Sequence, residues 1–295
     1  MSVLLMTVWL TGCVQEELGS TPSPAGNGIR FTLTVPDVNL PSVSSRTMTG
    51  TGTAKKEDEI ETVDILVFDM SKTPAVYLEC VSATGVTQDL ADNSTVSFSA
   101  VLSPTTASTC IVVVANKELD NIVSGFMKGT TTKVEAMEKM LHAQTGKWLA
   151  DGSTTGGYTR IPMYGEKVIS KITPSMDPIT GINMKRMLAR IDIRNNSATS
   201  NFTVEEVYLA NYNTTGYIAP AWNTNGQVTD PAPDTPVLPV NSGKMTEEGD
   251  AILYSVNGNT PYDGEIYTFE SIAAEDVGGV GQDGDCLLYT SPSPT

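Results

Sequence analysis

Short stretches in which every second residue is apolar, separated by segments rich in glycine, proline, serine and threonine, run through most of this chain of 295 residues. The first of them is 29–35, where Ile29, Phe31, Leu33 and Val35 alternate with polar residues. Successive side chains of a β-strand point to opposite faces, so this alternation is typical of a strand with one buried face. The chain is therefore expected to be mainly β.

Later stretches of the same kind predict a succession of short strands. In 60–69 apolar side chains occupy both faces, and 110–115 is a continuous apolar run. Both are therefore expected to lie inside a sheet that is covered on each face. The remaining strands are expected at 76–81, 94–98, 187–194, 204–211, 252–256 and 264–270.

Two short helices are expected between the strands. From Leu119 to Phe126 the apolar residues recur with a helical period of about 3.6. Thr132 and Glu135 form a capping box, which marks the start of a second helix, and Gly146 is expected to end it. The predicted fold class is thus all-β, mainly strands with two short helices.

The length indicates the number of domains, and the net charge excludes one class of partner. At roughly 150 residues per domain the chain has room for two, and a turn-rich stretch ending at Pro178 separates 29–178 from 179–276. Acidic residues outnumber basic ones by 34 to 18, a formal net charge of -16. Such a charge repels a phosphate backbone, so nucleic acid is not expected as a partner.

The N-terminus carries the pattern of an export signal. The apolar run from Val3 to Leu10 is too short to span a bilayer, and it ends in Leu-Thr-Gly-Cys, which looks like the lipobox of bacterial lipoproteins. Residues 1–13 are therefore interpreted as a lipoprotein signal peptide, with Cys13 acylated and holding the chain to a membrane. Residues 14–28 have the composition of a flexible linker. The alternative is an apolar start without lipidation.

The sequence gives no support for an enzyme. His142 is the single histidine and falls on the second predicted helix, so a histidine-based catalytic triad is not supported. The cysteines at positions 13, 80, 110 and 286 lack the close pairing of a zinc site. The acidic run 57–59 is expected to be a solvated edge in front of a strand. No catalytic residue, metal or cofactor is predicted.

Two of the cysteines, Cys80 and Cys110, both fall in predicted strands. An exported protein meets an oxidising compartment, where a disulfide between them would form if their Cα atoms lay within about 7 Å. Two buried free thiols are the other interpretation. It is favoured because nothing in the spacing fixes the register of the two strands.

Six short features follow one another in a characteristic order along the chain. They are the lipobox, the strand ahead of a loop arginine, Ile65–Asp69, Val112–Asn116, Ile161–Met163 and Leu188–Ile191. Together they resemble the fimbrillin family, the lipoprotein-derived subunits of type V pili, over residues 10–272.

This resemblance implies two transthyretin-like β-sandwich domains, export as a lipoprotein, and polymerisation of pilus subunits by donor-strand exchange. It also implies that an arginine-specific protease cuts the loop 36–54 between Arg46 and Thr47 and thereby removes the strand 29–35. The implied partners are other fimbrial subunits, the outer membrane through the lipid anchor, and a ligand on a host or bacterial surface. The implied location is the outer membrane, cell surface or fimbrium. A cleavable arginine favours a stalk or tip subunit over an anchor.

Residues 277–295 do not fit the family pattern. They become glycine-rich at Val277, and the segment from Cys286 to the end reads Cys-Leu-Leu-Tyr-Thr-Ser-Pro-Ser-Pro-Thr, which resembles translated sequencing-adapter sequence. The second domain is therefore expected to be incomplete and the chain to be truncated at its C-terminus. A disordered natural tail is the alternative.

A second class of function, a surface lipoprotein that binds glycans, stays open. Tyr208, Tyr212, Tyr217 and Trp222 lie within 15 residues of one another and could form a stacking platform for sugar rings. Packed sheets, however, also use aromatic residues in their cores. The glycan interpretation therefore requires these four rings on an exposed face.

Overall fold

The computed structural model describes residues 28–35, 58–88, 95–144, 146–148, 160–193, 203–210, 212–229, 237–239, 251–255, 262–270 and 287–293. The predicted lipidation site Cys13 and the predicted cleavage site between Arg46 and Thr47 lie outside these ranges. The loop 36–54 and the linker 14–28, except for its last residue, also lie outside them.

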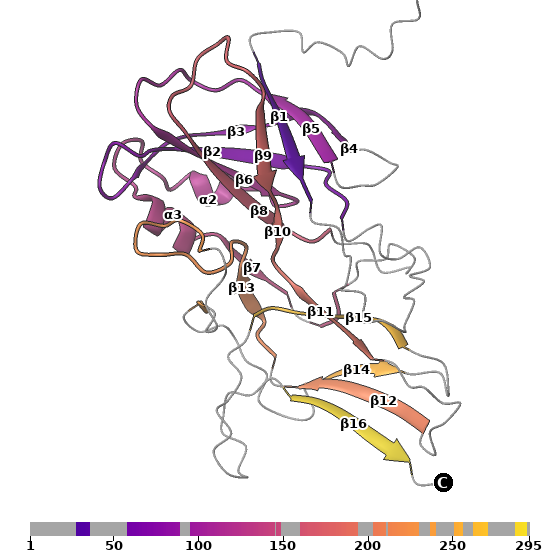
Figure 1. Ribbon diagram of the computed structural model, residues 1–295. Coiled ribbons are helices and arrows are strands. Elements are labelled where there is room, and N and C mark those ends of the chain that lie inside the picture. Colours follow the sequence, from indigo (N-terminus) through magenta and orange to yellow (C-terminus); the bar gives the residue numbers. More distant parts are fainter. Residues whose placement is uncertain are drawn as a thin grey trace, which may run out of the picture.

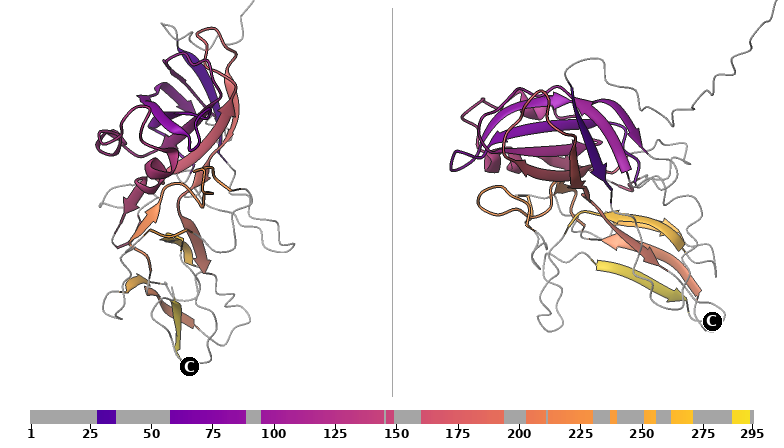
Figure 2. Two further views of the ribbon diagram at one scale, coloured as in Figure 1. Left: turned by 90° about the vertical axis from the view of Figure 1, so that its left-hand side faces the viewer. Right: turned by 45° about the horizontal axis from the view of Figure 1, so that its top comes forward.

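The strands between residues 29 and 186, apart from β7 (Leu141–Ala143), form two β-sheets that share a core (Figures 1 and 2). The four-stranded sheet has the order β4-β5-β1-β9 and the five-stranded sheet the order β10-β8-β6-β2-β3. All neighbouring strands are antiparallel except β1 and β9, which are parallel. The bounds are β1 Ile29–Thr34, β2 Val63–Asp69, β3 Val76–Ser82, β4 Thr84–Gln88, β5 Thr95–Ala100, β6 Thr109–Ala115, β8 Met163–Ile169, β9 Ile179–Asn183 and β10 Lys185–Arg186.

The five-stranded sheet is covered on both faces, and β6 at its centre is buried along its whole length. Ile111, Val113 and Ala115 face the core shared with the four-stranded sheet, whereas Cys110 and Val112 face a second apolar cluster. β2 divides its apolar side chains between the same two clusters. The prediction of central strands with two buried faces is confirmed at both places.

Two short helices lie on the second face of this sheet, α2 (Asp120–Val123) and α3 (Lys133–Glu138). The predicted capping box at the start of α3 is confirmed. Thr132 Oγ1 accepts a hydrogen bond from Glu135 N, and Thr132 N donates to Glu135 Oε2 at 2.8 Å. Two of the four unpaired amides at this helix end are thereby satisfied.

The predicted end of the second helix at Gly146 is wrong. The chain leaves the helix earlier, and Leu141–Ala143 form a strand, β7, which pairs with β13 (Thr215–Tyr217). A further backbone hydrogen bond of 2.9 Å joins Ile218 N to Met140 O beside this pair. Pairing with a segment far along the chain overrides the local helical pattern, which is a weak preference by comparison.

The second half of the chain contributes further small sheets, two of which lie at the opposite end of an elongated molecule from β4 and β5 (Figures 1 and 2). β11 (Ala189–Ile193) pairs with β15 (Tyr262–Thr268). β12 (Thr203–Ala210) lies between β14 (Ile252–Ser255) and β16 (Leu287–Ser293). The described chain thus consists mainly of strands with two short helices, and the predicted fold class is confirmed.

β9 and β10 lie beyond the predicted domain boundary at Pro178, yet they pair with β1 and β8 of the first predicted domain. Met184 stands between them, where the chain passes from one sheet to the other. The division into domains 29–178 and 179–276 remains a prediction, and the strands that pair with the first predicted domain extend to Arg186.

Replacing Gly165 of β8 by alanine is expected to lower the free energy of unfolding by about 1–3 kcal/mol, because the site is already full. A Cβ there would lie 2.8 Å from Ile182 Cγ2 and from Met184 Sδ, and 3.0 Å from the backbone oxygen of Asn183. Urea unfolding measures the change. Gly28→Ala is the matched control, since its nearest contacts are at 3.7 Å. Equal effects at the two positions would contradict the close packing of β8 on β9.

Candidate functional site

β1 is the first strand of the described chain, yet it lies inside a sheet rather than at its edge (Figure 1). It runs antiparallel to β5, from Ile29 opposite Ala100 to Thr34 opposite Thr95, and parallel to β9. Without β1, the strand pair β4-β5 would be separated from β9, and both sides would present unpaired backbone groups.

β1 fills an apolar groove between its neighbours. Ile29, Phe31, Leu33 and Val35 are 4%, 1%, 0% and 1% exposed. The ring of Phe31 stacks on that of Phe98 in β5, with centroids 5.0 Å apart and planes 8° from parallel. The sequence-based prediction of an amphipathic strand with these four side chains inward is confirmed, whereas removal of the strand stays a prediction.

Thr34 and Asp58, which lie on either side of the segment 36–57, are found at one corner of the sandwich. The carbonyl oxygen of Thr34 accepts a hydrogen bond from Met184 N at 2.8 Å. The carboxylate of Asp58 pairs with Arg186, two residues after Met184. The ends of the segment that carries the predicted cleavage site are therefore both held by the crossing from β9 to β10.

The solvated edge predicted for the acidic run 57–59 is wrong at Asp58, and Glu59 is paired as well, whereas Glu57 lies outside the described residues. Asp58 is 8% exposed and forms its ion pair with Arg186. Arg160 binds two further carboxylates, with 3.1 Å from Nη2 to Glu59 Oε1 and 2.6 Å from Nη1 to Glu61 Oε2. The local sequence gives no sign of these pairs, because the arginines lie 101 and 128 residues after their partners at 59 and 58.

A second set of hydrogen bonds fixes the same segment. Asn116 has a φ of 58°, in the left-handed region that asparagine tolerates. Its Nδ2 donates to the carbonyl oxygen of Glu59 at 2.8 Å, and its Oδ1 accepts from Glu61 N at 3.0 Å. Gln88 Oε1 of β4 accepts from Ile60 N at 3.0 Å. None of these bonds involves β1, so the start of β2 is held independently of it.

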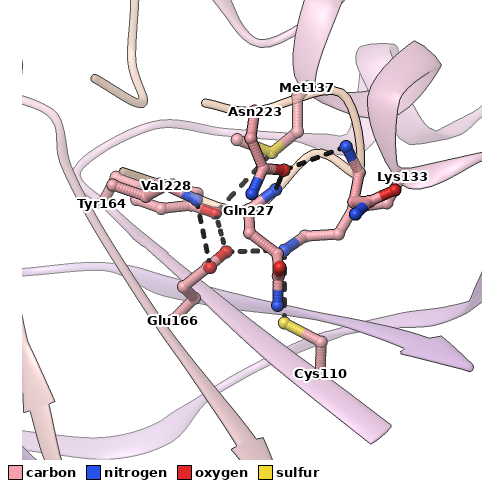
Figure 3. Close-up of polar contacts among 9 residues, drawn as sticks. Cys110, Lys133, Met137, Tyr164, Glu166, Asn223, Gln227 and Val228 are labelled. Carbon is pink, nitrogen blue, oxygen red and sulfur yellow. Dashed lines mark hydrogen bonds and ion pairs between the residues drawn. The ribbon is translucent and has the colours of Figure 1, made fainter. Parts of the chain in front are cut away.

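A buried lysine forms the centre of a second polar site, on the face of the five-stranded sheet away from β1 (Figure 3). Lys133 of α3 is 0% exposed, and its Nζ lies 2.6 Å from Glu166 Oε2 and 3.3 Å from Cys110 Sγ. The Tyr164 hydroxyl donates to the same Oε2 at 2.5 Å. We call these four residues the Lys133 cluster. Nothing in the sequence singled out Lys133 or Glu166.

The electrostatics of the Lys133 cluster favour a hydrogen-bonding tyrosine and a neutral thiol. Burial, and then the neighbouring Glu166 carboxylate, raise the pKa of Tyr164 well above its ordinary value, so the hydroxyl keeps its proton. Burial also raises the pKa of Cys110 to about 11, against the opposing effect of Lys133. The carboxylate of Glu166 is thus the acceptor for both the lysine and the tyrosine.

Glu166 also contacts a segment about 60 residues further along the chain. Its Oε1 accepts a hydrogen bond from Val228 N at 3.2 Å. Val228 is bridged to Trp222, and Asn223 N donates to Gln227 O at 2.8 Å, so 222–228 forms a tight turn (Figure 3). One carboxylate therefore connects β8, α3 and this turn.

His142 lies on β7 and not on a helix. It packs between the rings of Trp148 and Phe269, at centroid distances of 5.1 and 6.4 Å, and its Nδ1 is buried without a hydrogen-bond partner. Burial, with a smaller contribution from Lys117, lowers the pKa of the imidazole to about 4. The side chain is therefore half-buried and neutral at pH 7.

Acidification is expected to destabilise the protein through His142. The unfolded imidazole gains a proton near its ordinary pKa of 6.5, but the folded one only near 4, so its contribution is present above pH 6.5 and is lost as the pH falls towards 4. Discounted for partial exposure, the loss is about 1 kcal/mol between pH 7 and pH 5. Urea unfolding at both values measures it, and a His142→Gln protein should lose that much less. Equal losses in the two proteins would refute this role.

The four aromatic residues proposed as a glycan platform do not share an exposed face. Tyr212 is 4% exposed. Tyr217 and Trp222 pack edge to face with ring centroids 4.4 Å apart, and Tyr208 is half-buried on β12. The glycan-binding interpretation therefore lacks the platform that it requires from these residues.

Cys80 and Cys110 are free thiols on β3 and β6, with β2 between them. Cys80 lies opposite Leu66 and Cys110 opposite Phe68, so the two are separated by two strand spacings, about 10 Å, and are also offset along the strands, beyond the reach of a disulfide. Burial raises the pKa of the Cys80 thiol to about 12. In the segments that the structure describes, no group of histidine, cysteine, aspartate and glutamate is placed to hold a metal ion. No helix in those segments is long and apolar enough to cross a membrane.

Comparison with known families identifies the relatives of the chain. The sequence model of the family described as fimbrillin-A associated anchor proteins Mfa1 and Mfa2 matches residues 24–276. The chain belongs to this family. The resemblance to fimbrillins is thereby confirmed, and the fimbrillin-A associated family supports a role as a fimbrial protein of the cell surface.

Solved structures similar to this member of the fimbrillin-A associated family share little sequence with it. A fimbrial assembly protein from Parabacteroides distasonis is 11% identical, with a TM-score of 0.40 over 90% of this chain and 86% of the other. A candidate cell adhesion protein from the same species is 17% identical, with a TM-score of 0.46 over 85% and 72%. A candidate polysaccharide-binding protein from Bacteroides thetaiotaomicron is 14% identical, with a TM-score of 0.31 over 63% and 59%. No curated protein matches the chain.

Proposed function

We propose that the chain is a fimbrial subunit, exported as a lipoprotein lipidated at Cys13, in which β1 is a removable strand. An arginine-specific protease cuts between Arg46 and Thr47 and frees β1. An extended segment of a neighbouring subunit then takes its place. The observation that carries the proposal is the position of β1, which lies between β5 and β9 with its four apolar side chains buried.

An empty groove would be costly. The inward side chains of β1 bury ~300–400 Å² of apolar surface, which corresponds to at most roughly 8–10 kcal/mol at ~25 cal/mol per Å². β5 and β9 would also lose the backbone partner between them. A strand from another subunit restores both the apolar contacts and the hydrogen bonds, which links subunits head to tail.

The rest of the sandwich is arranged to survive the loss of β1. Between β1 and Asp58 the chain passes only through the segment 36–57, so one cut there detaches β1 and leaves every other described strand whole. The ion pairs of Asp58 and Arg160 and the hydrogen bonds of Asn116 hold the start of β2 without help from β1.

Limited digestion of the full chain with an arginine-specific protease tests the proposal. We expect a new N-terminus at Thr47 and higher-order species on native gels. Arg30 should resist, because its backbone is paired within β1. An Arg46→Ala protein is the matched control. If it is cut elsewhere and assembles as well as the parent in a piliated host, the mechanism is wrong.

A second candidate function is an anchor subunit that keeps β1, and the description of the family as anchor proteins favours it. In that role the lipid on Cys13 holds the base of the fimbrium, and cleavage after Arg46 is not needed. The mature N-terminus separates the two candidates. A lipidated Cys13 at the start of the assembled protein supports the anchor, and Thr47 at the start supports a stalk or tip subunit.

A further inference from the structure

We propose that Lys133 and Cys110 form a covalent nitrogen–sulfur bridge under oxidising conditions, so that the Lys133 cluster is a modification site. The two reacting atoms, Nζ and Sγ, are 3.3 Å apart and already in contact. Both residues are 0% exposed and sit on regular elements, α3 and β6. This proposal is independent of the function proposed for β1.

The lysine amine is held for attack on the sulfur. Figure 3 shows Nζ between the Glu166 carboxylate and the Cys110 sulfur, with a dashed contact to each. Glu166 is fixed in turn by the Tyr164 hydroxyl at 2.5 Å and by Val228 N at 3.2 Å. The carboxylate is therefore positioned to take a proton from the lysine, which converts the ammonium into a nucleophilic amine.

A cavity lies beside the Glu166 and Tyr164 side of the Lys133 cluster. It has a volume of about 250 Å³, and its lining includes Tyr164, Glu166, Lys185 and Val228 but neither Cys110 nor Lys133. The side chain of Glu166 is 16% exposed. Hydrogen peroxide is close to water in size and fits this space beside Glu166. With Cys80 two strands away, the lysine amine is the partner that an oxidised Cys110 meets.

The chemistry balances with a peroxide as the oxidant. The Cys110 sulfur attacks one peroxide oxygen and the oxygen–oxygen bond breaks. The thiol proton passes to the departing oxygen, which leaves as water, and the thiol becomes a sulfenic acid. Lys133 gives one proton to Glu166, and its amine then attacks Sγ. The sulfur–oxygen bond breaks, the hydroxyl takes a proton from the attacking nitrogen and leaves as a second water. Glu166 releases its proton to the cavity. Sulfur is oxidised by two electrons, and peroxide is reduced by two.

The environment makes this reaction selective. A buried neutral thiol reacts slowly with general reagents, and burial raises the pKa of Cys110 to about 11. Lys133 is the one contact that opposes this rise both through its charge and through a hydrogen bond. The bridge is therefore expected to depend on the folded arrangement and on the lysine. It would join β6 to α3 across 23 residues of chain.

Peptide mapping of the peroxide-treated full chain tests the proposal. We expect a linked pair of peptides containing positions 110 and 133, about 2 Da lighter than the sum of the two reduced peptides, and its disappearance after dithiothreitol. Trypsin should no longer cut after Lys133 in the linked fraction. Peroxide added to the urea-unfolded chain should give no such pair.

Three variants provide additional controls, but the test does not depend on them. A Cys80→Ser protein should form the bridge as well as the parent, whereas Cys110→Ser and Lys133→Gln proteins should not. The parent chain itself supplies the decisive readout, so a variant that fails to fold does not obscure it. Sulfinic acid at Cys110 beside an unmodified Lys133, or an untouched thiol after prolonged exposure, would overturn the proposal.

Discussion

Replacing Phe31 by alanine is expected to lower the free energy of unfolding by about 3–5 kcal/mol, the cost of truncating a buried aromatic residue. Phe31 is 1% exposed and stacks on Phe98 across the β1–β5 pair. The measurement is equilibrium urea unfolding of the full chain. A loss of this size means that the groove beneath β1 contributes a large part of the stability of the sandwich.

The matched control for Phe31→Ala is a change on the opposite face of the same strand. Arg30 is exposed, so Arg30→Thr keeps a good strand former and is expected to change the stability by no more than about 0.5 kcal/mol. If the two substitutions had equal effects, β1 would not be packed in the core, and its release would open no groove.

Replacing Glu166 by glutamine is expected to be as damaging, with a loss of about 3–5 kcal/mol, because it leaves the ammonium of Lys133 buried without a counter-charge. Lys133 is 0% exposed, and Glu166 is its ion-pair partner at 2.6 Å. Urea unfolding again measures the change. The Lys133→Met/Glu166→Gln double variant should recover most of the loss, because it removes both charges while the glutamine oxygen remains as an acceptor beside the Tyr164 hydroxyl and Val228 N.

Glu61 provides the comparison for Glu166. It forms an ion pair of similar length with Arg160, 2.6 Å, but its side chain is 61% exposed. Glu61→Gln is therefore expected to lower the stability by less than about 1 kcal/mol. Similar losses from Glu61→Gln and Glu166→Gln would contradict the claim that burial of Lys133 makes its partner essential.

Local sequence patterns were sufficient to predict a strand or helix where the buried residues follow the period of that element. The alternation at 29–35 and the apolar run at 110–115 predicted β1 and β6 within one or two residues. In a strand, the polarity of each residue indicates whether its side chain faces the core, and no distant partner is needed to make that inference. The box formed by Thr132 and Glu135 located the start of α3 for the same reason, since both of its partners lie within one turn.

Local sequence patterns gave a wrong prediction, or none, where a residue pairs with another residue far along the chain. β7 carries a helical period, but it pairs with β13, so Leu141–Ala143 are extended. The ion pairs of Asp58 and Glu59 depend on arginines that enter the corner from β10 and from just before β8. Sequence periodicity holds no information about such long-range contacts.

The candidate site was predicted in part. The inward side chains of β1 followed from alternation, whereas the position of β1 between β5 and β9 needed the topology. The Lys133 cluster escaped prediction because a lysine next to a helix start is usually a solvated residue. Its burial arises from the turn 222–228 of the second half, which packs over α3.

The most direct test of the account is exchange of β1 itself. The full chain is cut with an arginine-specific protease, and a fluorescent peptide of sequence 28–35 is added to the cut and to the uncut protein. We predict that the peptide binds the cut protein at one per chain, displacing the native strand, and that it does not bind the uncut protein. A peptide carrying Leu33→Asp should not bind either. Failure of the parent peptide to bind cut protein that keeps its β-rich circular dichroism, or equal binding to the uncut protein, would contradict the claim that β1 occupies an exchangeable groove.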